Sequence, residues 1–298
     1  MRRATGLCVL VFSVAAFVGC DTRGGGERPS NRATDRELRI VTLAPHLAEL
    51  VFAVGAEDAL VGVSSYTNYP PEATTLPIVG DAFSVDQERL VLLKPTLLLA
   101  WASGTPARVV DELRARGFRV ETIETRGLED IADAMEQIGK LTARTRQGSA
   151  AANEFRSGLR QLANHHGHPQ PISVFYQVSN SPLYTVNGDH YVSELIDLCG
   201  GRNIFSDLTM LAPLVDVEAV LARDPEVMLA SSDSPDDALV VWQRWPQLAA
   251  NEYHNYFLLP ADEIGRATPR LLTAGATLCE TLDEARRNRE AERDSDHS

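Results

Sequence analysis

The chain has 298 residues, of which 44% are hydrophobic, and its formal net charge is −13 at pH 7. This length and this apolar content are sufficient for two globular domains with cores of their own. The acidic balance argues against nucleic acid as a partner, and against docking on an anionic membrane surface through a basic face.

The first 20 residues are typical of a bacterial export signal. Two arginines precede an apolar run at residues 7–18, which is too short to span a bilayer. The run ends in Phe17-Val-Gly-Cys20, which is similar to the lipobox of bacterial lipoproteins, although Phe17 stands where leucine is usual. We expect a lipoprotein-type signal peptide over residues 1–20, with Cys20 acylated as the new N-terminus; ordinary cleavage without a lipid is the alternative. Asp21 is similar to the signal that retains lipoproteins at the inner membrane, so the expected location is the periplasm, anchored to that membrane.

Both ends of the mature chain lack a pattern that could pack. Residues 21–37 contain no apolar residue larger than alanine or proline and predict a flexible tether. Residues 286–298 are charged and aperiodic and predict a disordered tail. The folded part is therefore expected between residues 38 and 285.

Strand and helix alternate through residues 38–144. A strand at 39–43 is followed by a helix that begins at Pro45 and ends at Gly55. Ser84 and Gln87 form a capping-box pattern before the next helix, which Pro95 ends. Further segments in this half are strands at 60–63, 97–101 and 120–123 and a helix from 105 to 117. This alternation predicts an α/β lobe with a parallel sheet.

The second half repeats the alternation after a stretch without strands. Residues 145–165 predict a linker helix whose apolar stripe is narrow, so that most of it is solvated. Three histidines at 165–168 follow on a Gly/Pro loop, where a solvated role is favoured over metal binding. Residues 166–285 then predict a second α/β lobe. Its strands are expected at 173–178, 227–231 and 256–259, and its helices at 191–198, 216–224 and 268–282.

A segment of sixteen residues recurs 130 positions later (216 minus 86), where 86–101 matches 216–231. Each copy reads as a short helix, a proline and an apolar strand. A repeat at a fixed offset indicates two lobes built on one plan and puts Glu88 and Glu218 at equivalent points. The alternative is chance similarity between two common helix–proline–strand units.

Enzyme signatures are missing from the sequence. The chain has neither the glycine-rich phosphate motifs nor the serine-hydrolase and zinc-protease motifs. His46 and Glu49 begin a helix at metal-ligand spacing, but two ligands alone do not make a site. Cys199 and Cys279 remain in the folded part as an even pair, which indicates either a disulfide in an exported protein or two buried thiols.

Several segments together resemble the substrate-binding proteins of ABC importers for cobalamin, within a wider group that also binds ferric siderophores and haem. The similarity covers nearly all of 38–282, and the motifs occur in the family's order. The segments that carry it are 40–50, 61–71, 88–101, 198–205 and 266–270. The resemblance implies an α/β fold class, with two lobes and parallel-type sheets joined by a single long helix and a ligand cleft between the lobes. It implies a monomeric transport protein rather than an enzyme, with cobalamin as transported ligand, no cofactor or metal of its own, and an ABC permease with its ATPase subunits as partner.

The resemblance also assigns roles to individual residues. It implies that Glu88 and Glu218 dock into arginine pockets of the permease and that Cys199 and Cys279 form a disulfide. The residues expected to bind the ligand are Tyr66, Phe83, Trp101, Tyr184, Asp262 and Arg266. The family's tryptophans are absent near Ala82, beside Phe83, and near Ala212.

Aromatic side chains and a few polar groups suit a corrinoid, which is a broad and mostly apolar disc fringed with amides. For the aromatic residues the alternative is ordinary packing, and for Arg266 it is a surface ion pair with Asp262. His190 is interpreted as a hydrogen-bonded loop residue rather than a metal ligand. The competing functions are a haem or ferric-siderophore receptor of the same group and an exported two-lobed enzyme.

Overall fold

The computed structural model describes residues 37–81, 83–166, 170–232 and 238–296. The expected signal peptide, Cys20, most of the 21–37 tether and Ala82 lie outside these residues. The chain from Glu37 onward forms one compact unit. Within the part of the chain that is described, no helix is long and apolar enough to cross a membrane.

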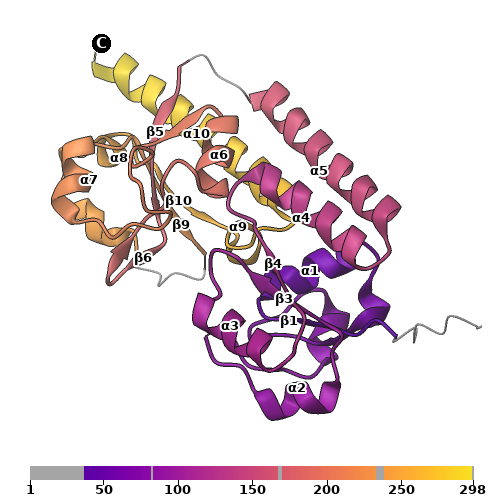
Figure 1. Cartoon of the computed structure of the whole chain (residues 1–298). Helices are drawn as coiled ribbons and strands as arrows, with labels where there is room; N and C mark the ends of the chain where they lie inside the picture. Colours follow the sequence, from indigo (N-terminus) through magenta and orange to yellow (C-terminus); the bar gives the residue numbers. More distant parts are fainter. Residues whose placement is uncertain (1–36, 82, 167–169, 233–237, 297–298) are drawn as a thin grey trace, which may run out of the picture. The chain divides into compact units, whose positions relative to one another are not determined.

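The N-terminal half builds a four-stranded parallel sheet in the order β2-β1-β3-β4, drawn in indigo and magenta in Figure 1. Pro45 opens the first helix, and glycines with positive φ, Gly55 and Gly117, follow two of the helices, because this backbone conformation disfavours other residues. The elements are β1 (Ile40–Thr42), α1 (Pro45–Ala53), a 3-10 turn (Glu57–Ala59), β2 (Leu60–Gly62), a second such turn (Pro71–Thr75), α2 (Gln87–Leu93), β3 (Leu97–Trp101), α3 (Ala107–Ala115) and β4 (Val120–Ile123).

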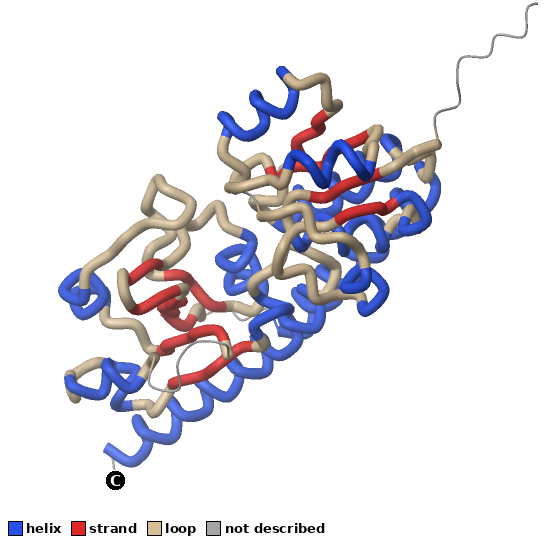
Figure 2. Tube along the Cα trace, turned by 90° about the horizontal axis from the view of Figure 1, so that it is seen from below, coloured by secondary structure: helices blue, strands red, loops and turns tan. Residues whose placement is uncertain are grey.

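The C-terminal half builds a second parallel sheet in the order β10-β9-β5-β8. Figure 2 shows the two sets of strands in red. The elements are β5 (Ile172–Gln177), a hairpin of β6 (Ser179–Asn180) and β7 (Leu183–Tyr184), α6 (Tyr191–Leu198), β8 (Gly201–Asn203), α7 (Val217–Arg223), β9 (Val227–Ser231), a 3-10 turn (Val240–Arg244), α8 (Ala249–Glu252), β10 (Tyr256–Leu259), α9 (Ala261–Ile264) and α10 (Leu271–Asp296).

Two helices, α4 (Leu128–Leu141) and α5 (Thr145–His166), connect the halves and pack against each other. Ion pairs add to the contact that the thin apolar stripe of α5 makes with α4. Arg156 of α5 pairs with Asp133 and with Glu136 of α4, each at 2.8 Å. The long helix of the expected fold class is therefore present between the two sheets.

The repeat found in the sequence has the same local structure in both halves. The carboxylates of Asp86 and Asp216 accept hydrogen bonds from the backbone N–H three residues later, at 3.0 and 2.7 Å. Asp86 is therefore the N-cap of α2, not Ser84 as the capping-box pattern predicts. Each helix ends on a residue in the left-handed region, Lys94 with φ 47° and Asp224 with φ 42°.

Both repeat strands divide their side chains between the same kinds of core. In β3, Leu97 and Leu99 belong to a large core that draws residues from both halves, while Leu98 and Ala100 belong to a smaller core under α2 and α3. In β9 the residues 130 positions later alternate in the same way. The shared core combines residues of α1, α4, α5, α6 and α10, so the two halves are packed on one apolar interior.

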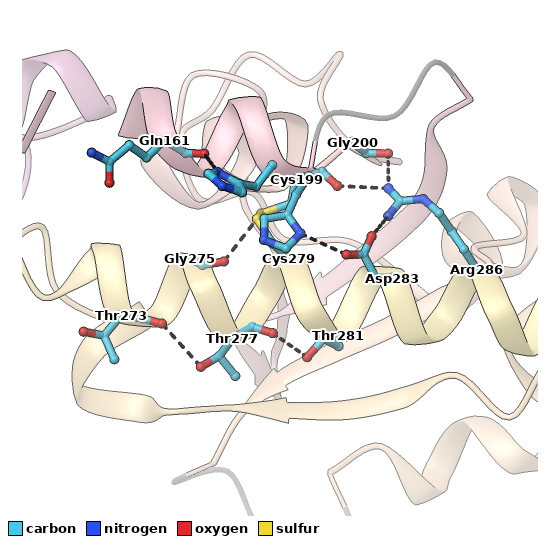
Figure 3. The surroundings of a disulfide bond; sticks show 12 residues. Gln161, Cys199, Gly200, Thr273, Gly275, Thr277, Cys279, Thr281, Asp283 and Arg286 are labelled. Carbon is cyan, nitrogen blue, oxygen red and sulfur yellow. Dashed lines mark hydrogen bonds and ion pairs between the residues drawn. A yellow bond between two sulfur atoms is a disulfide. The ribbon is translucent and has the colours of Figure 1, made fainter. Parts of the chain in front are cut away.

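The expected disordered tail at 286–298 is wrong for the residues described, because α10 continues to Asp296. Arg286 and Arg289 are 6% and 8% exposed. Arg286 donates to the carbonyl oxygens of Cys199 at 2.9 Å and Gly200 at 2.7 Å, as Figure 3 shows, and Arg289 pairs with Glu226 at 3.0 Å. A charged segment can pack when every guanidinium finds an acceptor, and the sequence pattern does not reveal these acceptors.

Cys199 and Cys279 form a disulfide between the end of α6 and the middle of α10. Both cysteines are fully buried. The bond closes a sequence separation of 80 residues. The structure therefore selects the disulfide over the pair of buried thiols.

Candidate functional site

A cavity of about 570 Å³ lies between the two halves and is lined by both of them. The N-terminal half contributes the ends of β1 and β3, the start of α1 and the loops after β2. The C-terminal half contributes the end of β5, the start of α6 and the turn between α9 and α10. The carboxyl ends of parallel strands are the usual position for a ligand in α/β folds.

Trp101 lies at the end of β3 on the cavity wall. Its backbone N–H donates to Thr105 Oγ1 at 3.1 Å, and its ring meets the His46 ring edge-on at 5.2 Å between centroids. Gly104 lies against the indole so closely that a Cβ there would be 1.8 Å from Trp101 Cε3. The indole Nε1 is buried without a hydrogen-bond partner among the described residues. The turn after β3 thus holds an aromatic ring in one place on the wall.

Tyr66 and Phe83 form an aromatic rim on the N-terminal side of the cavity. They are 80% and 65% exposed, which is unusual for side chains of this size. Tyr66 has φ 66°, in the left-handed region, and its carbonyl accepts a hydrogen bond from Arg266 at 3.0 Å. A residue of the opposite half thus helps to hold Tyr66 at the rim.

Arg266 belongs to a polar network that joins the halves at one side of the cavity. Glu49 of α1, whose side chain is 3% exposed, pairs with Arg266 at 3.2 Å and with Arg270 at 2.7 Å. The hydrogen bonds that Arg270 donates to the Glu49 carboxylate raise the pKa of Arg270 above its usual value. Arg270 also lies over the ring of Tyr69, with its Cζ 4.3 Å from the ring centroid. The network holds the guanidinium group of Arg266 in place on the cavity wall.

Two neutral imidazoles line the cavity, and the sequence assigned neither to the ligand site. Burial and the nearby Arg266 charge lower the pKa of His46 to about 3, and burial lowers the pKa of His190 to about 4. His190 Nδ1 accepts the backbone N–H of Val192 at 3.2 Å as the N-cap of α6, so its proton is on Nε2. His46 Nε2 lies 3.4 Å from Thr125 Oγ1. The prediction that His190 is a hydrogen-bonded loop residue is confirmed by its N-cap bond to Val192.

Four of the six residues expected to bind the ligand line the cavity: Tyr66, Phe83, Trp101 and Arg266. Tyr184 is not among the lining residues. It lies in β7, 37% exposed, opposite Leu214. Asp262 is also outside the lining, where it accepts from Asn68 and pairs with Arg266 at 3.2 Å.

Glu88 and Glu218 lie away from the cavity, in the first turns of α2 and α7. Both side chains are exposed, and neither has an ion-pair partner among the residues described. The two carboxylates occupy equivalent points of the repeat.

The lining is dominated by aromatic and aliphatic side chains. In the described ranges, no group of three or more His, Cys, Asp or Glu side chains is arranged to hold a metal ion. The wall offers apolar contact area, and Arg266 and His190 add hydrogen-bond donors to the lining. Such an arrangement can hold a large, mostly apolar molecule that carries polar acceptors at its periphery.

The chain is similar to known vitamin B12-binding proteins over most of its length. It is 37% identical to that of Vibrio cholerae over 250 residues, which are 84% of this chain and 90% of the relative. It is 33% identical to that of Photorhabdus laumondii over 247 residues, which are 83% of this chain and 88% of the relative. The match therefore covers both halves of the fold.

Solved structures show the same architecture. The periplasmic vitamin B12-binding protein BtuF of Vibrio cholerae matches with a TM-score of 0.75 at 37% identity, covering 83% of this chain and 97% of that chain. The haem-binding protein HutB of Vibrio cholerae matches with a TM-score of 0.72 at 21% identity, over 83% and 99% of the chains, and this lower identity speaks for the fold alone. The model of the periplasmic binding protein family matches residues 40–255. The chain belongs to the periplasmic binding protein family.

Proposed function

We propose that this protein is an extracytoplasmic substrate-binding protein that captures cobalamin and delivers it to an ABC import permease. The observation that carries the proposal is the apolar cavity between the two halves, lined by Trp101, Tyr66, Phe83 and Arg266. The 37% identity to a vitamin B12-binding protein over both halves supports a corrinoid as the ligand of this cavity. A transport role also agrees with the family, which binds solutes in the periplasm.

The chemistry of the wall suits a corrinoid. The flat faces of Trp101, Tyr66 and Phe83 offer contact area to an apolar disc at a small entropic cost, because aromatic side chains have few rotatable bonds. Arg266 and the Nε2–H of His190 are donors for amide carbonyls at the periphery of the disc. Cobalamin brings the metal within its own ring, so the wall needs no metal ligand from the protein. In this proposal, Asp262 acts by positioning Arg266, and Tyr184 contacts only an extended part of the ligand.

Delivery requires a second surface, which we assign to Glu88 and Glu218. One exposed carboxylate in each half lets a pseudo-twofold protein contact a twofold permease through charge-assisted hydrogen bonds to arginines. We further propose that Cys20 is acylated and anchors a monomer to the inner membrane, because the residues around it are similar to a lipobox. Mass spectrometry of the mature N-terminus tests the acylation.

The direct test is titration of the purified protein with cobalamin. We expect a one-to-one complex of micromolar or better affinity, and release of chemically unchanged cobalamin on denaturation. Trp101→Ala should weaken binding by ~1–3 kcal/mol if the indole is a central anchor. Absence of heat and of any spectral change at high micromolar protein would exclude cobalamin as the ligand, and conversion of the ligand would favour an enzyme.

Haem is the second candidate, and one observation favours it. The phenol of Tyr66 is exposed at the rim of the cavity, where it could ligate an iron. His46 is buried beside Thr125, and neutral His190 accepts at Nδ1 and carries its proton on Nε2, so neither offers a lone pair to iron and Tyr66 is the group to test. A shift of the haemin Soret band on mixing with the protein would support haem binding if the shift is absent in Tyr66→Phe. Unchanged haemin spectra together with cobalamin binding would exclude it, and the same titration with a ferric siderophore tests the remaining ligand of the group.

A further inference from the structure

Helix α2 presents large apolar side chains to solvent. Val91 is 63% exposed and Leu92 is 79% exposed, and Leu90 is the only buried residue of the helix. A surface helix of a globular protein usually does the reverse, with its apolar stripe on the core and charged residues outside. The exposed apolar side chains of α2 therefore indicate a surface that another molecule covers.

The exposed apolar residues share their face with Glu88. Residues 88, 91 and 92 are spaced i, i+3 and i+4, which places them side by side on one helix surface. The helix is held by the Asp86 cap at its start and by the left-handed Lys94 at its end. We call the surface formed by Glu88, Val91 and Leu92 the α2 face. The α2 face thus combines one carboxylate with two exposed apolar side chains on a helix whose ends are both fixed.

The repeat provides an internal comparison. The residues 130 positions later are Glu218, Leu221 and Ala222. Leu221 is half-buried and packs against the core of the C-terminal half, and Ala222 is exposed but small. The carboxylate is thus present in both copies, whereas the apolar part is present in α2 alone.

We propose that the α2 face is the apolar half of the permease contact, with Val91 and Leu92 inserted into a hydrophobic depression beside the arginine that receives Glu88. This inference rests on the proposed function and adds an asymmetry to it. The N-terminal half binds through charge and apolar burial, and the C-terminal half binds through charge. A charged contact surrounded by buried apolar surface is shielded from water, which strengthens the ion pair.

Two other occupants fit the charges less well. A symmetric dimer through the α2 face would bring Glu88 toward the Glu88 of a second copy, because such an interface pairs the same patch on both subunits. An anionic lipid surface would face the same carboxylate on a chain of net charge −13. Nearby Arg89 does not offset Glu88, since it donates to the carbonyl of Ile78 at 2.8 Å and pairs with Asp86. A partner with an apolar depression and a cation is the one that matches both parts of the face.

The test uses Val91→Ser combined with Leu92→Ser, with Ala222→Ser as the control at the equivalent point of the other copy. A second control, Leu258→Ser, removes a 47% exposed apolar side chain of β10. Binding of each variant to vesicles that contain the permease and ATPase subunits of the same organism is measured beside cobalamin binding by the isolated protein. We expect the double variant to bind the permease vesicles about tenfold more weakly, which corresponds to the loss of a moderate hot spot. Both controls should bind like the parent protein, and cobalamin affinity should be unchanged in all variants.

The outcomes separate this inference from the function beneath it. Parent-like vesicle binding by the double variant overturns the α2 face, whether or not cobalamin binds. Failure of the parent protein to bind cobalamin overturns the proposed ligand, while a selective loss of vesicle binding in the double variant still supports the α2 face. A parent dimer in sedimentation that the serine variant abolishes, or equal binding to vesicles without permease, would assign the face to a second copy or to lipid and overturn the inference.

Discussion

Replacing Gly104 by alanine is the sharpest test of how the cavity wall is built. A Cβ at this position would lie 1.8 Å from Cε3 and 2.2 Å from Cζ3 of Trp101. Ordinary contact begins at 3.4 Å, so the ring has to move by about 1.6 Å (3.4 minus 1.8). The Trp101 backbone is held by pairing with Ile123 of β4 and by Thr105, so the side chain has to rotate instead. Because the cavity lies beside the ring, rotation changes the surface that meets the ligand.

We expect Gly104→Ala to lower the free energy of unfolding by about 1–3 kcal/mol, the usual range for overpacking. Cobalamin affinity should fall by about tenfold or more, as expected for the loss of a central aromatic contact. Calorimetry measures the affinity and urea denaturation measures the stability. The part of the indole emission that Trp101→Ala removes reports the displaced ring, because Trp242 and Trp245 also emit. Ser103→Ala, an exposed change in the same turn, is the control and should leave cobalamin affinity unchanged.

A double-mutant cycle isolates the contact. In a Trp101→Ala background the space beside residue 104 is vacant, so Gly104→Ala should have little further effect on cobalamin affinity. The coupling energy should therefore be close to the loss caused by Gly104→Ala alone. Additive losses, or full affinity in Gly104→Ala with unchanged indole emission, would refute the reasoning.

Three further changes test the framework around the cavity. Glu49→Gln removes the buried carboxylate shared by Arg266 and Arg270, which keep their more exposed partners Asp262 and Glu263. It should destabilise the protein by about 1.5–3 kcal/mol in urea denaturation, and a loss below about 1 kcal/mol would contradict the importance of the network. Cys199→Ser with Cys279→Ser should cost about 2–4 kcal/mol by releasing the unfolded chain, and thiol counting on unreduced parent protein should find neither cysteine free. The pKa of His190 is lowered to about 4 from 6.5, so the unfolded state takes the proton first. Stability present above pH 6.5 should fall as the pH drops toward 4, by up to about 3 kcal/mol, and this slope should flatten in His190→Asn, which keeps an N-cap acceptor.

The repeat was predictable because it depends on local patterns. The proline stop and the alternating strand burial are encoded within sixteen residues, and both copies follow them. The start of α2 was placed less well, because its N-cap is Asp86 and not the predicted Ser84. The helical end of α10 was not predictable in this way. Its arginines are buried against carbonyls and a carboxylate that lie far away in sequence, and no local pattern distinguishes them from solvated charge.

The site was predictable only in part, for a related reason. Trp101 follows an apolar strand, and its position at the carboxyl end of a parallel sheet puts it at the cavity. Tyr184 ends the two-residue strand β7, and this short hairpin places it outside the lining. His46 stands in a helix start that reads like any other, and its location on the wall depends on how α1 packs against β3. Residues whose role is set by tertiary packing leave no signal at fixed sequence spacing.

The single interior shared by both halves affects how the chain reaches its folded state. Leu47 near the start and Leu282 near the end belong to the same core, so that core stays incomplete until almost the whole chain is available. Contacts between such distant segments slow folding, because the closure of long loops precedes the gain from burial. During synthesis, the first half would emerge with an exposed apolar side and without the helices that cover it. Such a chain completes its core late and stays unfolded for longer after synthesis, and an unfolded chain is what the export that we propose would require.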